Sequence, residues 1–328
     1  MLVETAASVR SLVWRGGELV EVVGGLAWDA GGVERRVHPG HGAGVDRAVV
    51  SPSGRYSVVY AERGTTALVL DGARVVRELT RSPYHAKDFD YPVTLGSLPD
   101  GREVLVHCPD EYDVLQMEEV ESGKRLTAGA REAKDVFHSR LSVTPDGRHL
   151  LVAGWVWHPY GIVEVFDLDG ALKDPAVLDG RGTLLAEADI DAEVESACWL
   201  DDDRLVVATG DEDFLDEDEA PAFGPRRLGV WSLSGRGWLH RNPVGFKAGT
   251  LIAGGGRVVS LHGRPRLVDV TTGAVLAEWP EVEVARREGP YGVTHVPTPV
   301  AALHPDGTCL AIAVAGGIAV LPLPDAGG

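Results

Sequence analysis

An all-β fold built from repeated four-stranded units is predicted by two features of this sequence. First, one kind of turn recurs four times, at Ser51–Gly54, Leu98–Gly101, Thr144–Gly147 and His304–Gly307. Second, four short apolar runs separated by turns recur with a period of about 40 to 50 residues. This combination is typical of a β-propeller, in which each unit forms one blade. Because each blade packs only on its neighbours, we expect residues 1–328 to form a single domain.

The predicted strands are short runs rich in β-branched residues, set between clusters of Gly, Pro and Asp. The second unit is the clearest, and its strands, labelled A to D from the propeller axis outward, are Ala48–Val50, Tyr56–Tyr60, Ala67–Leu70 and Val75–Leu79. The first unit is degenerate but supplies a comparable set. Seven blades are therefore predicted, at approximately residues 8–38, 45–80, 92–128, 139–178, 194–241, 246–280 and 298–323.

The later units repeat the same order of strands. The second strand of the third unit is predicted at Val104–Val106. The first three strands of units four to seven are predicted at Leu141–Val143, Leu150–Ala153 and Val163–Leu168; Ser196–Leu200, Leu205–Ala208 and Leu228–Leu233; Thr250–Ile252, Val258–Leu261 and Leu267–Val270; and Val300–Leu303, Leu310–Ala313 and Ile318–Leu321.

The two ends of the chain predict how the ring closes. The last unit stops at Leu323 without a fourth strand, whereas Met1–Ala6 precede the first unit and resemble an isolated strand. An open ring would leave unpaired strand edges, which sheets avoid. We therefore expect residues 1–7 to complete the last blade.

Several turns also carry a resemblance to a known family. The segments Val165–Gly170, Val230–Gly235 and Val268–Gly273 resemble the Trp-Asp-plus-turn element of WD40-type propellers. The Pro-Asp-Gly turns resemble the A–B turn of WD40-like bacterial propellers. This resemblance covers nearly the whole chain, implies the fold and is nearly silent on activity. The Gly-His dipeptide of true WD40 repeats is missing from the matching positions, which suggests a divergent member.

The composition indicates a soluble globular protein with an acidic surface. Hydrophobic residues make up 44% of the chain and charged residues 24%, both ordinary values for a folded domain. The formal net charge is −18. Such a surface repels phosphate backbones, so nucleic acid is not an expected partner.

Signals for disulfides, export and membrane insertion are weak. Cys108, Cys198 and Cys309 are odd in number and widely scattered, which does not fit a disulfide framework. The N-terminus lacks the pattern of a signal peptide. The apolar run 309–323 has 15 residues and is interrupted by Gly316, whereas about 20 are needed to span a bilayer. We expect a cytoplasmic protein without a membrane segment.

The loops predict which face of the propeller binds ligands. The A–B and C–D connections are short, whereas the D–A and B–C connections are long and rich in His, Tyr, Trp and charged residues, and they emerge on one face. Loops on a rigid scaffold often carry function. An alternative is that these side chains only cap the channel or bond backbone groups. The candidate ligand-binding residues are His41, Arg47, Tyr84, His85, Tyr91, Tyr112, Trp155, Trp157, His158, Tyr160 and Tyr291.

A second set of candidates lies just before the inner strands, where side chains from several blades can reach the channel mouth. Two histidines with carboxylates could hold a divalent ion, or act as a base and its orienting group with a raised histidine pKa. A hydrogen-bonded, water-filled channel is the alternative. The candidate catalytic residues are His138, His295, Asp90, Glu195 and Arg140, and the candidate metal ligands are His138, His295 and Glu195.

The segment Asp211–Glu219 holds seven carboxylates in nine residues at the position of the fifth B–C loop. The segment lacks the glycine and the spacing of a calcium-binding loop. Mutual repulsion of the carboxylates instead predicts a mobile acidic flap, which a basic partner could order.

Two functions remain open from the sequence. The first is a scaffold that binds a protein, peptide or small ligand on the loop-rich face. The alternative is a metal-assisted lyase or hydrolase with its site at the channel mouth, a hypothesis that depends on analogy of fold. The sequence contains no phosphate loop, dinucleotide-binding fingerprint, HExxH or GxSxG, so the familiar nucleotide, zinc-protease and serine-hydrolase sites are unsupported.

Overall fold

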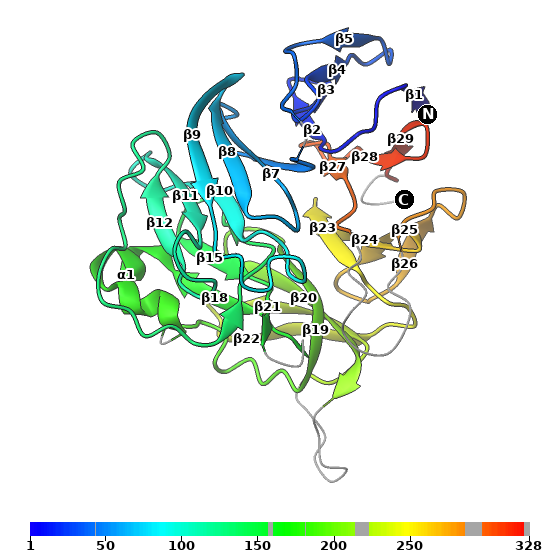
Figure 1. Cartoon of the computed structure of the whole chain (residues 1–328). Coiled ribbons are helices and arrows are strands. Elements are labelled where there is room, and N and C mark those ends of the chain that lie inside the picture. Colours follow the sequence, from blue (N-terminus) through cyan, green and yellow to red (C-terminus); the bar gives the residue numbers. More distant parts are fainter. Residues whose placement is uncertain (43, 157–159, 181, 214–222, 286–296, 325–328) are drawn as a thin grey trace.

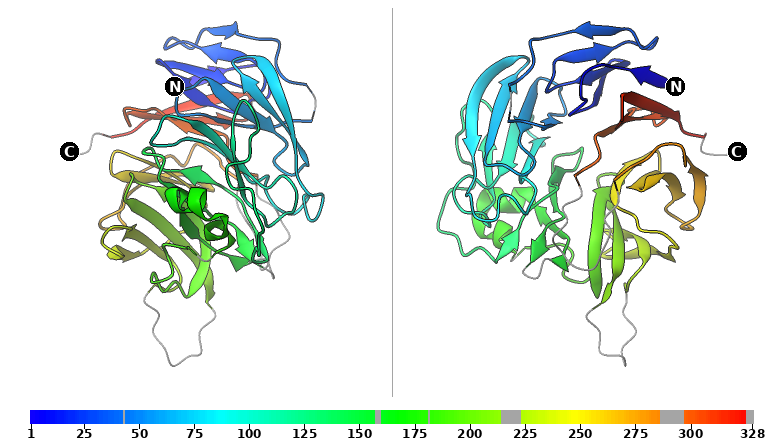
Figure 2. Two further views of the ribbon diagram at one scale, coloured as in Figure 1. Left: turned by 90° about the vertical axis from the view of Figure 1, so that its left-hand side faces the viewer. Right: turned by 45° about the vertical axis from the view of Figure 1, so that its right-hand side comes forward.

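The computed structural model describes all residues except 43, 157–159, 181, 214–222, 286–296 and 325–328. Antiparallel sheets succeed one another around a central axis, in sequence order, and form a seven-bladed propeller (Figures 1 and 2). This confirms the predicted fold class. Among the described residues, no helix is long and apolar enough to cross a bilayer.

Five blades have four strands each. Blade 1 contains β2 (Val13–Arg15), β3 (Glu18–Glu21), β4 (Leu26–Trp28) and β5 (Glu34–Arg36); blade 2 contains β6 (Arg47–Val50), β7 (Tyr56–Tyr60), β8 (Thr66–Asp71) and β9 (Arg74–Thr80). Blade 5 contains β19 (Ala192–Trp199), β20 (Arg204–Asp213), β21 (Arg227–Ser232) and β22 (Gly237–Pro243); blade 6 contains β23 (Thr250–Gly254), β24 (Arg257–His262), β25 (Arg264–Asp269) and β26 (Val275–Glu278). Blade 7 contains β27 (Ala301–Leu303), β28 (Cys309–Val314), β29 (Gly317–Pro322) and the N-terminal β1 (Leu2–Glu4).

The N-terminal strand closes the ring as expected. Strand β1 pairs antiparallel with β29, with Val3 opposite Ile318. The amino group of Met1 donates to the carbonyl oxygen of Val320 at 2.8 Å. Val3 is buried in an apolar cluster with Trp28 of blade 1 and Ile318 of blade 7. The first and last blades are therefore joined by both backbone pairing and side-chain packing.

Blades 3 and 4 differ from the others at their outer position. Their strands are β10 (Val93–Ser97), β11 (Glu103–His107) and β12 (Gln116–Glu119) in blade 3, and β14 (Ser142–Val143), β15 (His149–Val152) and β18 (Glu164–Asp167) in blade 4. In blade 3 the Thr127 hydroxyl accepts the Met117 N–H at 2.9 Å, so a side chain replaces one strand-to-strand bond. The third blade is otherwise completed by a single bridge between Glu118 and Arg125.

In blade 4 two helical turns follow the third strand, where a fourth strand was predicted. Helix α1 (Leu168–Lys173) begins at Asp167, whose side chain accepts the Asp169 N–H, and the 3-10 helix η1 (Pro175–Asp179) begins with a proline. Proline suits a first helical turn because its missing N–H would have no partner there. Leu168 and Leu178 are buried between blades 3 and 4, and α1 lies on the rim of the molecule (Figure 1).

A small additional sheet lies among the connections between blades 3, 4 and 5. It consists of β13 (Val136–Phe137), β16 (Trp155–Val156) and β17 (Tyr160–Gly161). Phe137 is directly opposite Trp155. This sheet was not expected from the sequence, because it joins a D–A connection to a B–C connection of the next blade.

The core is divided among the junctions between blades. The buried apolar side chains of the described residues form seven clusters, each joining two neighbouring blades. Two inner-strand tryptophans repeat one contact: Trp14 donates to the Ala302 carbonyl of blade 7 at 3.0 Å, and Trp199 donates to the Ser142 carbonyl of blade 4 at 3.2 Å. Packing between neighbours is what lets a chain of this length form one ring.

The backbone geometry of the recurring turn requires a glycine at its last position. Gly54, Gly101, Gly147 and Gly307 all have φ between +73° and +84°, which favours glycine. At Gly147 a Cβ atom would also lie 1.8 Å from the carbonyl oxygen of Ser97 in the preceding blade. Glycine at this position therefore serves both the turn and the close approach of two blades.

Candidate functional site

Six ring-bearing side chains meet on the face formed by the D–A and B–C connections. We call this group, Tyr84, His85, Phe89, Tyr112, Phe137 and Trp155, the aromatic cluster. They come from four separate segments: the β9–β10 loop, the β11–β12 loop, β13 and β16. Four of them, Tyr84, His85, Tyr112 and Trp155, are among the predicted ligand-binding residues.

The rings are arranged around Phe137. Phe89 stacks on Phe137 with centroids 3.9 Å apart, and Tyr112 stacks on it at 4.9 Å. Tyr84 lies 4.9 Å from Tyr112, and Trp155 lies 5.6 Å from Phe89. Phe137 is 4% exposed, whereas Tyr84 is 49% exposed. The cluster therefore has a buried base and an exposed edge.

The loop that carries three of these rings is held by one arginine. Arg81 donates to the carbonyl oxygens of Gly64, Ala86, Phe89 and Asp90 at 2.7–2.9 Å. Each charge-assisted bond fixes a backbone group that would otherwise need water. The exposed part of the cluster is thus presented on an ordered loop.

Trp155 is fixed from its other side by Arg140. The Arg140 guanidinium lies 4.5 Å from the centroid of the Trp155 ring, and it donates to the carbonyl oxygens of Ala153 and Glu195 at 3.2 and 2.7 Å. Arg140 has a φ of +47°, an uncommon value for a residue with a side chain. Arg140 was a catalytic candidate, and in the structure it bridges blades 4 and 5 beside the cluster.

Carboxylates surround Tyr112. Its hydroxyl donates to Asp135 at 2.6 Å. Burial, followed by the charges of Asp135 and Glu111, raises the pKa of Asp113. Burial and the hydrogen bond to Asp135 also raise the pKa of Tyr112. This side of the aromatic cluster is therefore electronegative.

His138 has an environment that differs from the expected one in its burial and in the direction of its pKa shift. It is 4% exposed, and its Nε2 atom lies 3.0 Å from the backbone carbonyl oxygen of Asp113. Burial lowers its pKa to about 4. The expectation of a raised pKa was therefore wrong, because the loss of water around the ring outweighs neighbouring charges.

The other described candidates at the channel mouth are engaged by the protein. Glu195 accepts the backbone N–H groups of Ala248 and Gly249 at 2.8 and 3.4 Å, and burial raises its pKa. Asp90 and Tyr91 are buried, and Tyr91 lies 5.0 Å from the guanidinium of Arg81. Tyr160, on β17, is half-buried and pairs with Val156.

The predicted metal site has only part of its residues in the described chain. Across the residues that the structure describes, no three His, Cys, Asp or Glu side chains are grouped so that they could hold a metal ion. His295, together with Trp157, His158 and Tyr291, lies outside the described residues. The pairing of His138 with His295, and with it the metal-assisted enzyme, stays a prediction.

The first three residues of the acidic segment, 211–213, belong to strand β20, so they are not part of a flap. Asp211 lies on β20 and forms ion pairs with Arg226 at 2.5 Å and Lys247 at 3.4 Å. The first carboxylate of the run is thus neutralised within the protein. Residues 214–219 lie outside the described part of the chain, so the flap itself stays a prediction.

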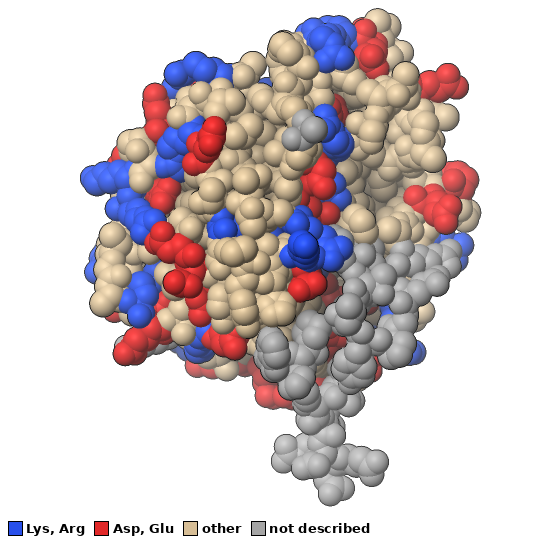
Figure 3. Space-filling view, viewed as in Figure 1, with Lys and Arg blue, Asp and Glu red and all other residues tan. Residues whose placement is uncertain are grey.

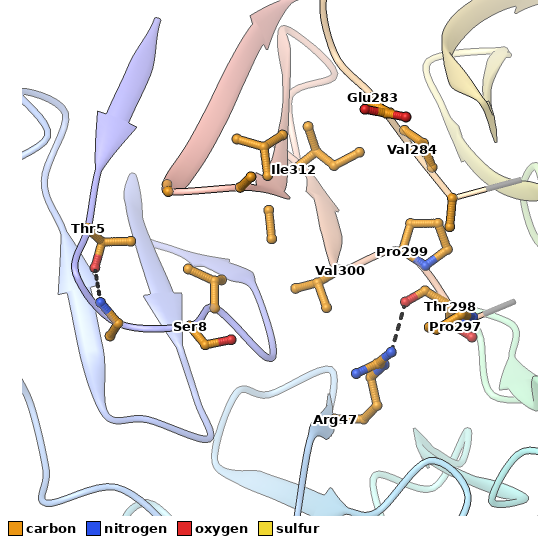
Figure 4. A pocket seen from close by; sticks show the side chains of 18 of the residues that line it. Thr5, Ser8, Arg47, Glu283, Val284, Pro297, Thr298, Pro299, Val300 and Ile312 are labelled. Carbon is orange, nitrogen blue, oxygen red and sulfur yellow. Dashed lines mark hydrogen bonds between the residues drawn. The ribbon is translucent and has the colours of Figure 1, made fainter.

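Two cavities open on the same face as the aromatic cluster, nearer the junction of blades 7, 1 and 2. The first has a volume of about 560 Å³ and lies between the segments Thr5–Val9, Pro297–Val300 and Ile312–Gly317, with Arg47 at one side (Figure 4). Arg47 pairs with Glu62 at 2.8 Å and donates to the Thr298 carbonyl at 3.2 Å. Its charge is therefore already compensated.

The second cavity, of about 450 Å³, lies on blade 1 and contains the predicted residue His41. Arg10, Glu21 and Arg36 line it, around the tight connection of Gly24. The ring of His41 lies 4.9 Å from that of His38. This cavity shares only the segment Ala7–Ser8 with the first.

Sequence reasoning missed Phe89 and Phe137 as members of the cluster. Each stands in a D–A connection, and an isolated phenylalanine there has the same signal as a core residue. The residues that could have pointed to them are their neighbours Tyr84 and Tyr112, which were selected because they are polar aromatics.

Comparisons with known proteins inform the fold alone. No protein-family model matches the chain, and no curated protein matches it in sequence. A solved structure described as "Crystal Structure of Mitotic Checkpoint Complex" contains a similar chain, with a TM-score of 0.63 and 12% identity over 99% of this chain and 91% of that one. At this identity, the similarity shows that the two chains share a fold over almost their whole lengths.

Proposed function

We propose that this protein is a binding scaffold whose aromatic cluster docks a basic segment of a protein partner. The observation that supports the proposal best is the convergence of six rings from four separate segments on one face, with Tyr84 half exposed. Tyrosine and tryptophan offer a large apolar surface with a polar edge, and they are enriched where proteins recognise each other.

Charge favours a basic partner. Three carboxylates, Asp88, Glu111 and Asp135, are exposed beside the rings, against one exposed lysine of the same loop as Asp88, Lys87. The nearby Lys134 donates to the Gly180 carbonyl on the side of η1. A lysine or arginine side chain can lie over an aromatic face while its charge meets a carboxylate. The formal net charge of −18 would also speed the approach of a basic segment.

The arrangement suits a preformed site. Arg81 holds the loop of Tyr84 through three of its carbonyl groups and ties it to the carbonyl of Gly64, and the buried Phe137 supports the rings. A surface that is ordered before binding loses less conformational entropy when a partner docks. We therefore expect the affinity to reside in a few rings, above all the exposed Tyr84 and the partly buried Tyr112.

A peptide-display selection tests the proposal. The full chain is used as bait for a random peptide library, with the Tyr84→Ala/Tyr112→Ala variant as the counter-bait. The control bait is Leu276→Ala, which removes a side chain that is 48% exposed on β26, in blade 6. We expect enriched peptides rich in Lys or Arg together with apolar residues, retained by the control and lost by the double variant. Enrichment that the double variant retains, or a preference for acidic peptides, would contradict the proposal.

A further inference from the structure

Two arginines, Arg10 and Arg36, line the cavity on blade 1. Elsewhere on the surface acidic and basic side chains are interspersed (left side of Figure 3), and several pair with each other, such as Arg55 with Asp71 and Arg125 with Asp110. The chain has 49 acidic and 31 basic residues, so carboxylate partners are abundant. Arg81 bonds to carbonyl groups instead, and it meets four of them at one loop junction.

Arg10 and Arg36 have no carboxylate partner. Within the described part of the chain, no carboxylate lies within 4.0 Å of either guanidinium, and each is held by carbonyl groups only. Arg10 donates to Val45 at 3.1 Å. Arg36 donates to Gly24 at 3.1 Å and to His38 at 3.4 Å. The neighbouring Arg35 shows the contrast, because it pairs with Glu18 at 2.5 Å.

Both guanidiniums approach the same point of the cavity. Arg36 donates to the carbonyl oxygen of Gly24, and a Cβ atom at Gly24 would lie 3.9 Å from Nη2 of Arg10. The carboxylate that lines the cavity, Glu21, is buried and already accepts the Ser11 hydroxyl at 2.9 Å and the Gly24 N–H. Two guanidiniums against one carboxylate leave a positive charge at the wall.

A third group completes the site. The Nε2 atom of His41 is buried and has no hydrogen-bond partner among the described residues. Burial, followed by the charges of His38 and Arg10, lowers the pKa of His41, so the ring is neutral at pH 7. A buried polar atom without a partner is costly, and a turn of the ring toward the cavity would let its N–H donate to a bound oxyanion.

We propose that this cavity binds a small molecule that carries an oxyanion group, a phosphate or a carboxylate, between Arg10 and Arg36. Planar guanidiniums match both groups through paired hydrogen bonds. The volume of about 450 Å³ is within the range of small-molecule sites, so there is room for a ligand larger than the oxyanion alone. This site is separate from the aromatic cluster, and its test does not depend on the proposed scaffold function.

Calorimetric titration of the full chain with inorganic phosphate, pyrophosphate and citrate, each at constant ionic strength, tests the site. We expect at least one of them to bind, and Arg10→Gln/Arg36→Gln to weaken its Kd at least about tenfold, since a charge-assisted hydrogen bond contributes at least that factor. Arg35→Gln is the matched control and should change the Kd less than about twofold. Binding of the phosphates alone would identify a phosphate ester, and binding of citrate alone a carboxylate.

Amide chemical shifts provide a readout that does not depend on the variants folding. On adding the probe that binds, the Gly24 and Gly42 resonances should move, whereas that of Gly235 in blade 5 should not. The proposal is overturned if none of the three probes binds with a Kd below about 10 mM. It is equally overturned if the double variant binds as tightly as the natural protein, or if the shifts are spread evenly over the blades.

Discussion

Phe89 and Phe137 stack with their ring centroids 3.9 Å apart and their planes inclined by 13°. The two residues come from successive D–A connections, one entering blade 3 and the other entering blade 4. Their contact joins the two connections, and Tyr84, Tyr112 and Trp155 are arranged around it. The part of the protein that we propose to bind a partner is therefore built on a packed aromatic pair.

This arrangement predicts that the base and the edge of the cluster respond differently to truncation. Phe137→Ala should lower the free energy of unfolding by about 3 kcal/mol, because a buried ring leaves a cavity. Tyr84→Ala should cost less than about 1 kcal/mol, because half of that side chain is exposed. Urea denaturation measures both, and equal losses would mean that the cluster is merely part of the core.

Ring closure by β1 predicts a large effect of a buried residue at the N-terminus. Val3→Asp should lower the melting temperature by several degrees, because it places a charge among Trp28 and Ile318. Leu2→Asp is the control, since Leu2 is on the same strand and 57% exposed. Differential scanning calorimetry compares the two variants. If both melt like the natural protein, β1 does not close the ring in solution.

The burial of His138 predicts a pH-dependent stability. Its pKa is about 4 in the folded protein and about 6.5 when unfolded, so the unfolded state binds the proton more readily. The contribution of the neutral ring is complete above pH 6.5 and is lost as the pH falls toward 4. Between pH 7.5 and pH 5 the loss should be about 2 kcal/mol.

Urea denaturation at the two pH values, with the natural protein and with His138→Gln, isolates this contribution. Glutamine cannot titrate, so the variant should lose about 2 kcal/mol less over the same interval. An identical pH dependence for the two proteins would show that His138 is not the group responsible.

The burial of His138 and the two backbone N–H groups bonded to Glu195 predict that divalent metals do not stabilise the protein through these residues. Adding Zn²⁺, Mn²⁺, Mg²⁺ or Ca²⁺ should leave the melting temperature unchanged within about 1 °C, because a ligand stabilises only the state that binds it. A rise of several degrees that His138→Ala abolishes would instead support the predicted metal site.

The repeated four-stranded blades were predicted from the sequence, whereas the different outer positions of blades 3 and 4 were not. Turns that require glycine, such as the one at Gly147, repeat at a fixed period and are visible in the chain. The helical end of blade 4 was missed, although Asp167 and Pro175 are ordinary signals of helix starts. These two helix signals were not used, because the repeat predicted a fourth strand at this position.

The candidate site was predicted in part for a similar reason. Loop position alone selected Tyr84 and Tyr112, whose ring centroids lie 4.9 Å apart in the structure, because propeller geometry brings those loops together. It could not show that His138 is buried or that Glu195 is bound by two amides. Burial of a loop side chain depends on contacts between blades, which no local pattern reports.

The most direct measurement of the central claim is the affinity of one basic peptide, taken from the selection described above, for the natural protein and for Tyr84→Ala. Calorimetric titration should give a Kd weakened at least about tenfold by Tyr84→Ala, since truncating an exposed aromatic anchor commonly costs that much. Leu276→Ala, on blade 6, should leave the Kd unchanged. An unchanged Kd in Tyr84→Ala, or an equal loss in Leu276→Ala, would contradict recognition by the aromatic cluster.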